Sequence, residues 1–274
     1  MFNCFHYPSG FIGQILMVFD PFIIAMTFWG GTLSLFVQYM LYAFITFDKK
    51  MNKMFAGVIV GLMLCLTEAT LGIFYVYAWD QFDLNGQVAL SVIFGISWFS
   101  MIQVVTWLYV LRINSLGKYM KFDGFIWYIP FIIGALELAS VFSIFLRTLN
   151  ISSNVFRYSS LIFSIGAVIF EIFMTFLLLR KLRFILEYQE ELLHSLFWHI
   201  VSACVVVLLL EFIILGLKII GSSIDNAARP FAYIVRIYVV IQFYDKLITG
   251  IRFGSSFGDN SLSMDNAMNI VVTV

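Results

Sequence analysis

Seven stretches of about twenty mostly apolar residues, separated by short polar segments, occupy nearly the whole chain. They run over residues 21–46, 54–78, 87–111, 124–146, 158–182, 192–219 and 230–250. The hydrocarbon core of a bilayer is about 30 Å thick and a helix rises about 1.5 Å per residue, so each stretch can cross it once. The pattern predicts an all-α membrane protein built as a bundle of seven transmembrane helices.

Composition agrees with this architecture and divides the chain simply. Hydrophobic residues make up 62% of the 274 and charged residues only 12%, about half of the charged share that a soluble domain carries. We expect a short extracellular segment over 1–20, a transmembrane domain over 21–252 and a flexible cytoplasmic tail over 253–274. The tail is rich in Ser, Asn and Asp, a composition typical of disorder.

The basic residues outside the spans predict the orientation. Eleven of the sixteen flank the first, third and fifth connections or the C-terminal segment: Lys49, Lys50, Lys53, Arg112, Lys118, Lys121, Arg180, Lys181, Arg183, Lys246 and Arg252. Four lie on the opposite side: Arg147, Arg157, Lys218 and Arg229. Positive residues stay in the cytoplasm, so we expect the N-terminus outside and the C-terminus inside. This orientation places the sequon Asn150-Ile151-Ser152 outside, where Asn150 is a candidate for glycosylation.

Ionisable side chains within the spans are the main indication of a functional site, because a charge in hydrocarbon costs at least ~2.5–3.5 kcal/mol. The candidate ligand or ion site comprises Glu68, Glu137, Glu171, Glu211, Arg236, Gln242 and Asp245. Counted from the outer span ends, Glu68, Glu137, Glu211 and Arg236 share a layer ~9–15 Å below the outer surface. Glu171 is expected nearer the midplane and Asp245 near the cytoplasmic side.

Helical spacing predicts that these groups face the interior of the bundle. The second span carries a stripe of small residues with one acid, and the fifth span repeats the pattern. The first stripe is Gly57, Gly61, Cys65, Glu68 and Gly72; the second is Ser160, Ser164, Ala167, Glu171 and Thr175. Small residues let membrane helices approach closely, and polar ones need partners that lipid does not offer.

Two interpretations of the acids stay open. In the first, the acids have a structural role: a neutral Glu can hydrogen-bond a neighbouring helix and hold the two helices together. We also expect Glu211 and Arg236 to form an ion pair between consecutive spans. Five acids against one buried arginine, however, cannot all be paired and charged. Some are therefore neutral, or they line a wet or ligand-filled cavity in the outer half of the bundle.

The residues that a retinal protein or a zinc enzyme would need are not suitably placed in this sequence. Lys246, next to Asp245 near the cytoplasmic end, is poorly placed for a retinal Schiff base, and His194 and His199 do not share a helix face as zinc ligands would. Three cysteines form no disulfide framework. We expect no enzyme, no cofactor, no metal site and no nucleic-acid partner.

With seven spans, an outer N-terminus and short connections, residues 20–250 resemble the G-protein-coupled receptors in topology. The third span ends Val110-Leu111-Arg112-Ile113, where the largest class of these receptors has an acidic-Arg-aromatic triplet. The resemblance therefore covers topology only, and no residue role is carried over from it.

Two functions follow. The first is a receptor-like sensor that binds a small ligand in the outer half and signals to a cytoplasmic partner through helical extensions of the fifth and sixth spans. The second is a proton- or cation-coupled transporter or exporter of a small or lipidic substrate. Transporter helices commonly break near the midplane, and Pro130 is the only proline inside a span. In either case the protein is multi-pass, in the plasma membrane or an endomembrane.

Overall fold

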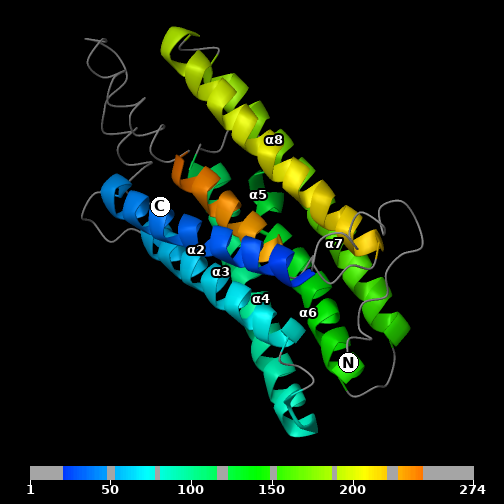
Figure 1. Ribbon diagram of the computed structural model, residues 1–274. Coiled ribbons are helices and arrows are strands. Elements are labelled where there is room, and N and C mark those ends of the chain that lie inside the picture. The colour runs from blue at the N-terminus through cyan, green and yellow to red at the C-terminus, as the bar shows by residue number, and fades with distance from the viewer. Residues whose placement is uncertain are drawn as a thin grey trace.

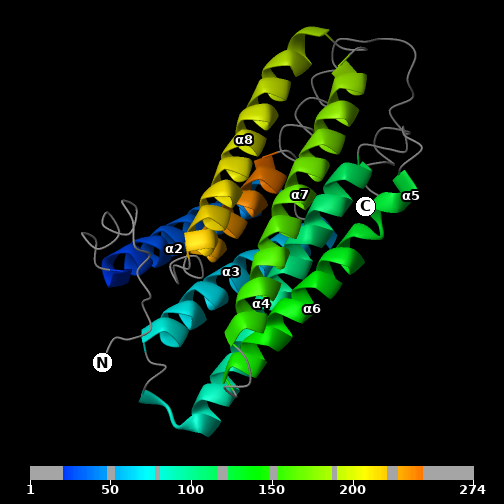
Figure 2. The ribbon, with the colours of Figure 1, turned by 90° about the vertical axis from the view of Figure 1, so that its right-hand side faces the viewer.

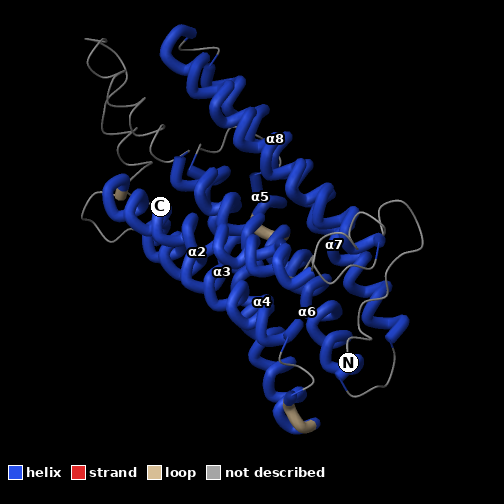
Figure 3. The backbone as a smooth tube through the Cα atoms, viewed as in Figure 1, coloured by secondary structure: helices blue, strands red, loops and turns tan. Residues whose placement is uncertain are grey.

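The computed structural model describes residues 21–47, 53–77, 81–115, 123–148, 153–186, 190–220 and 228–242. These residues are almost entirely helical and contain no strand (Figure 3). The helices are α2 (Pro21–Thr46), α3 (Lys53–Tyr77), α4 (Leu84–Ser115), α5 (Asp123–Ile126), α6 (Ile129–Thr148), α7 (Ser153–Leu186) and α8 (Glu190–Ile220). Residues 228–242 are helical as well, and we refer to them as the 228–242 helix.

Six segments of the described chain are long and apolar enough to cross a membrane. The side chains are arranged as a bilayer requires: large apolar groups such as Ile45, Phe131 and Ile169 are exposed around the bundle, whereas four glutamates and three arginines are buried inside it. Hydrocarbon accepts apolar side chains and offers no hydrogen bonds, so this distribution fits a protein solvated by lipid. The chain is therefore a polytopic helical membrane protein.

The helices pack largely in chain order. α2 contacts α3, α3 contacts α4, α4 contacts α6, α6 contacts α7 and α7 contacts α8 (Figure 1). α4 and α7 also touch. Short connections favour such neighbours because each helix returns beside the previous one.

The 228–242 helix lies inside this arrangement, between α2 and α8 (Figure 2). None of its residues is exposed. On one side its Tyr238 ring stacks on Tyr39 of α2 at a centroid distance of 4.3 Å. On another side Ala228 and Ala232 share an apolar cluster with Ile214 of α8. The 228–242 helix therefore contacts both α2 and α8, and in this way closes the bundle.

Most helix ends lie close to those that the hydropathy pattern predicts, although α7 begins at Ser153, five residues before the predicted start at 158. The first helix covers residues 21–46, as predicted. The third begins earlier than predicted, at Leu84, because Asp83 caps it: the Gly86 backbone N–H donates to Asp83 Oδ1 at 2.9 Å. The described part of the last helix covers 228–242, and the rest of the predicted span lies outside the described residues.

Pro130 lies just after a break in the predicted fourth span. It is the second residue of α6, which follows α5 after a turn at Trp127 and Tyr128. Proline fits the first turn of a helix because the N–H that it lacks would have no partner there. The break separates residues 126 and 129, close to the start of the predicted fourth span.

The helices α7 and α8 are longer than a bilayer requires. With 34 and 31 residues they reach about 51 and 46 Å, against a hydrocarbon thickness of about 30 Å. The predicted helical extensions around residues 180–191 are present: α7 continues to Leu186 and α8 begins at Glu190.

Close helix approach depends on glycine at the α4–α6 contact. A Cβ placed on Gly95 would lie 2.7 Å from Cγ1 of Val141. Val141 is β-branched and has essentially one side-chain rotamer in a helix, so it cannot turn away.

We expect Gly95→Ala to lower the melting temperature of the purified protein in detergent, because overpacking a tight contact costs about 1–3 kcal/mol. Gly30→Ala is the matched control: it makes the same change within a helix, with no atom within 4 Å of the added Cβ. The control should be neutral or slightly stabilising, since alanine favours helix more than glycine does. Equal melting temperatures for the two variants would contradict the close contact.

Candidate functional site

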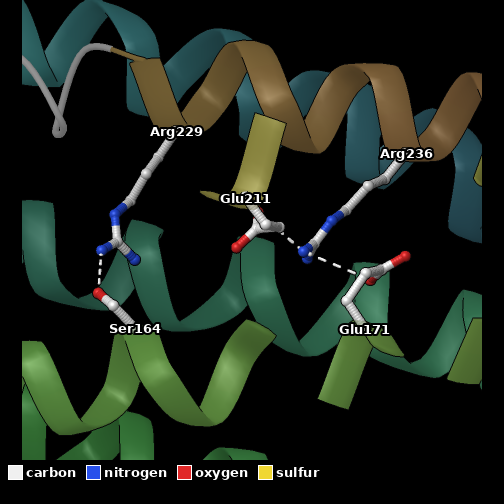
Figure 4. A network of polar contacts seen from close by, with 5 residues as sticks. All are labelled: Ser164, Glu171, Glu211, Arg229 and Arg236. Carbon is white, nitrogen blue, oxygen red and sulfur yellow. Dashed lines mark hydrogen bonds and ion pairs between the residues drawn. The ribbon is translucent and has the colours of Figure 1, made fainter. Parts of the chain in front are cut away.

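An ion-pair cluster lies in the polar core of the bundle. Nη2 of Arg236 lies 2.8 Å from a carboxylate oxygen of Glu211 on α8 and 3.3 Å from one of Glu171 on α7 (Figure 4). All three side chains are buried. The predicted pair of Glu211 and Arg236 is therefore confirmed, and Glu171 joins it as a second carboxylate.

A second arginine lies two helical turns earlier on the same helix. Nη2 of Arg229 donates to Oγ of Ser164 at 2.5 Å, and its guanidinium carbon lies over the rings of Trp98 and Phe163 at 5.0 and 5.6 Å. Aromatic faces attract a desolvated cation through their quadrupole. This buried guanidinium is therefore stabilised by π systems as well as by hydrogen bonding.

Each of the two arginines contacts a side chain of α7, and the two contacts have the same spacing on both helices. Arg229 and Arg236 are seven residues apart, and so are their partners Ser164 and Glu171. Equal spacing means that α7 and the 228–242 helix run in the same direction, with contacts about 10.5 Å apart along their axes. Figure 4 shows both arginines extending from one helix toward α7. We call the group of side chains around Arg229 the outer layer and the group around Arg236 the inner layer.

The contact between α3 and α4 determines the level of Glu68. A Cβ on Gly57 would lie 2.9 Å from Leu108, and one on Gly61 would lie 3.4 Å from Val104, so the two helices run antiparallel. Eleven residues beyond Gly57, Glu68 therefore stands level with Ser97.

The same reasoning places Glu68 beside the outer arginine. Gly61 also meets Ile237 of the 228–242 helix, with 2.9 Å between its added Cβ and Cδ1 of Ile237. Seven residues further along α3, which runs antiparallel to that helix, Glu68 is level with residue 230, next to Arg229.

Glu137 reaches the same level from α6. Gly166 of α7 meets Leu136 of α6, with 3.1 Å between its added Cβ and Leu136 Cδ1, so Glu137 stands beside the position of Ser164. Arg229 and Glu68 are both among the charges that act on the Glu137 carboxyl. The outer layer thus comprises Glu68, Ser97, Trp98, Glu137, Ser164 and Arg229.

The carboxyls of Glu68 and Glu137 lack hydrogen-bond partners. Both side chains are 0% exposed, and none of their four oxygens makes a hydrogen bond. The Ser97 hydroxyl faces Glu68, and the Gln103 amide, which lies against Gly134, faces Glu137. A buried unpartnered carboxylate is costly, so these two groups are the ones in the core that need an explanation.

Two residues counted as loop charges in the sequence are in fact buried. Arg229 is part of the outer layer, and Arg112 is fully buried with its guanidinium carbon 5.5 Å from the Tyr109 ring. The interpretation of five acids against one arginine was therefore wrong: the described core holds four glutamates and three arginines. The seven-residue spacing of Arg229 and Arg236 is the sequence signal that could have placed Arg229 inside.

The remaining candidates have other positions. Nε2 of Gln242 donates to the Tyr238 hydroxyl at 2.7 Å, and Tyr238 belongs to the aromatic contact with Tyr39 rather than to either layer. Asp245 and Asn150 lie outside the described residues. Within the described ranges no three His, Cys, Asp or Glu side chains converge as a metal site would require.

The inner layer predicts strong coupling between its members. Arg236→Met leaves two buried carboxylates facing each other, whereas Glu211→Gln still leaves Arg236 paired with Glu171. We expect both to lower the melting temperature, Arg236→Met more severely, because breaking a buried ion pair costs about 3–5 kcal/mol. The Arg236→Met/Glu211→Gln double variant should lose less than the sum of the two. Strictly additive losses, measured by thermal unfolding in detergent, would contradict the pairing.

No family model matches the chain, and no curated protein or solved structure is significantly similar to it. The proposed function therefore rests on the residues of the polar core.

Proposed function

We propose that the protein is a seven-helix, receptor-like sensor, with its N-terminus outside, its C-terminus in the cytoplasm and a small ligand bound in the outer half of the bundle. The observation that carries this proposal is the position of the 228–242 helix, whose two arginines reach the outer and the inner layer at once. A change at one layer is transmitted to the other by a single helix.

The inner layer supplies the response. Arg236 joins α7 to α8, and both of these helices are longer than a bilayer's thickness requires. A ligand that displaces Arg229 moves Arg236 with it and alters the ion pairs that hold α7 to α8. The cytoplasmic ends of those helices, at residues 186 and 190, then change their separation where a signalling partner would bind.

The distribution of basic residues supports the orientation. Because Arg112 and Arg229 are buried, each side loses one residue, and eleven against four becomes ten against three. The excess remains on the side that we assign to the cytoplasm. The 228–242 helix, as the beginning of a seventh span, then leaves the C-terminus on that side. The sequon at Asn150 lies on the opposite side, as glycosylation requires.

The transporter alternative is supported by the unpartnered carboxyls of Glu68 and Glu137, which suit proton or cation transfer. However, α3, α4, α7 and α8 continue without a break through the level of both layers. Coupled transporters commonly bind their ions at helices that unwind at midplane. The continuous helices favour the sensor. We assign no catalytic role to any residue, and we propose lipid, a small-molecule ligand and a cytoplasmic protein as the partners.

The orientation predicts where tags are accessible. An epitope added after Met1 should react with antibody on intact cells, and one added after Val274 only after permeabilisation. The excess of basic residues on one side is the physical reason. The reverse accessibility would overturn the proposed orientation of every helix.

Coupling between the layers predicts that a small change in the outer layer alters the α7–α8 separation. Spin labels at Arg180→Cys and Ser202→Cys, both exposed positions, report the distance between the two helices. The natural cysteines, Cys4, Cys65 and Cys204, are first replaced. We expect Ser164→Ala, which removes the partner of Arg229, to shift or broaden this distance.

Ile165→Ala is the matched control, because Ile165 is adjacent to Ser164 but faces lipid. Its distance distribution should equal that of the parent protein. Unchanged distributions in both variants would contradict the sensor mechanism. Accessibility of a Ser97→Cys thiol to reagents from both sides of the membrane would favour the transporter instead.

A further inference from the structure

We propose that the ends of α7 and α8 at one membrane boundary bind an anionic phospholipid, whose phosphate pairs with the guanidinium of Arg180. This proposal goes beyond the sensor function and does not rest on it. It does not rest on the proposed orientation either, because the boundary at which α7 ends and α8 begins is defined by the helices themselves. Three observations support it: the depth of Arg180, the level of Trp198 and the charge at that level.

Arg180 lies at the end of the lipid-facing surface of α7. Ile165, Ile169 and Phe176 are exposed along this surface, and Arg180, exposed as well, follows them at helical spacing. The part of α7 that is apolar and long enough to cross a membrane, Leu161–Arg180, ends at this residue. Its guanidinium is therefore placed where the acyl chains end and the headgroups begin.

Trp198 marks the same boundary on α8. The part of α8 that is apolar enough to cross a membrane begins at Phe197, and the Trp198 side chain is 57% exposed. Tryptophan is enriched at the level of the headgroups, since its ring is apolar and its N–H is polar. An exposed tryptophan at the end of an apolar helix therefore indicates that the headgroups lie at this level.

The register of the two helices brings these ends together. α7 and α8 are consecutive in the chain and pack side by side (Figure 2). Glu171 and Glu211 both reach Arg236, so these two positions are level. Arg180 lies nine residues beyond Glu171, and Trp198 lies thirteen residues before Glu211 on the antiparallel helix. The two residues therefore differ in depth by only about 6 Å.

The charge at this level is positive and is not neutralised by either helix. Lys181 and Arg183 follow Arg180 on α7, whereas neither 172–186 of α7 nor 192–210 of α8 contains an Asp or Glu. Within the part of the chain that the structure describes, no carboxylate forms an ion pair with Arg180. The guanidinium of this residue is thus available to an anion from outside the protein.

The first acids of α8 lie further from the membrane. Glu190 and Glu191 begin this helix, eight and seven residues before Trp198, which corresponds to a rise of about 10–12 Å. Negatively charged headgroups attract basic groups that lie within a Debye length of the surface and repel acids there. Basic residues at the headgroup level, with the acids beyond it, are the arrangement that such a surface favours.

An anionic phospholipid fits this boundary better than a zwitterionic one. A guanidinium binds phosphate oxygens through two parallel hydrogen bonds. In a zwitterionic headgroup the lipid's own cationic group competes for the same phosphate, whereas an anionic headgroup has no such group. The exposed side chain of Phe176, one turn before Arg180, is in position to contact the acyl chains of the same lipid.

The test is the affinity of the purified protein for single lipids, measured by native mass spectrometry with phosphatidylglycerol and phosphatidylcholine of identical acyl chains. We expect the parent protein to bind phosphatidylglycerol more tightly. Arg180→Gln should weaken this binding about fivefold, which is the contribution of one basic residue close to a charged lipid surface, and leave phosphatidylcholine binding unchanged. Arg180→Lys, which keeps the charge, should bind phosphatidylglycerol more tightly than Arg180→Gln does.

Lys218→Gln is the matched control. It removes one positive charge from the last turn of α8, at the end opposite to Trp198. Its affinity for phosphatidylglycerol should equal that of the parent protein. Equal affinities of the parent for the two lipids would overturn the proposal, and so would an Arg180→Gln protein that binds phosphatidylglycerol as tightly as the parent. A loss in Lys218→Gln as large as that in Arg180→Gln would show attraction without a site and overturn it as well.

Tryptophan fluorescence locates the bound lipid. Bromine atoms on an acyl chain quench a tryptophan that they touch, so brominated phosphatidylglycerol should quench the parent protein more than brominated phosphatidylcholine does. We expect Trp198→Phe to remove this excess and Trp29→Phe, a change in α2, to retain it. An excess that persists in Trp198→Phe would place the lipid elsewhere and contradict the proposal. Neither lipid measurement depends on the spin-label distances, so the lipid site and the sensor mechanism can fail separately.

Discussion

The structure depends on the burial of the Arg236 guanidinium. Hydrocarbon provides nothing to solvate a positive charge, so the group must find carboxylates within the protein. Glu171 and Glu211 supply them from two different helices, at 3.3 and 2.8 Å. That requirement brings α7, α8 and the 228–242 helix together at one depth.

The polar core and the apolar surface are consequences of the same solvent. Exposed isoleucine and phenylalanine side chains cover the outside, while every described glutamate within a span is buried. Glycines at the helix contacts, such as Gly61 against Ile237, let the backbones come close enough for short polar contacts to form. Close packing and buried charge therefore support each other: the first provides the distances that the second requires.

Hydropathy was sufficient to predict where the helices lie, because about twenty apolar residues have few alternatives to spanning a bilayer. Depth counting also predicted the Glu211–Arg236 pair. It missed Arg112 and Arg229, since a charged residue at the end of a span can point into the bundle or out to water, and hydropathy does not distinguish the two. It also placed Glu68 and Glu137 in one layer with Glu211 and Arg236, which was wrong: the helix register sets Glu68 and Glu137 level with Arg229, about 10.5 Å from the level of Arg236. This register is determined by contacts such as that of Gly57 with Leu108, which hydropathy does not reveal.

The central position of the 228–242 helix has a consequence for biogenesis. A segment with two arginines is poorly retained by lipid when it leaves the insertion machinery on its own. Its stable environment exists only once α7 and α8 present Ser164, Glu171 and Glu211. The 228–242 helix, the last one that the structure describes, thus needs α7 and α8 in place before its arginines find their partners. Incomplete bundles would retain unneutralised carboxylates within the membrane, a feature by which cellular quality control can recognise them.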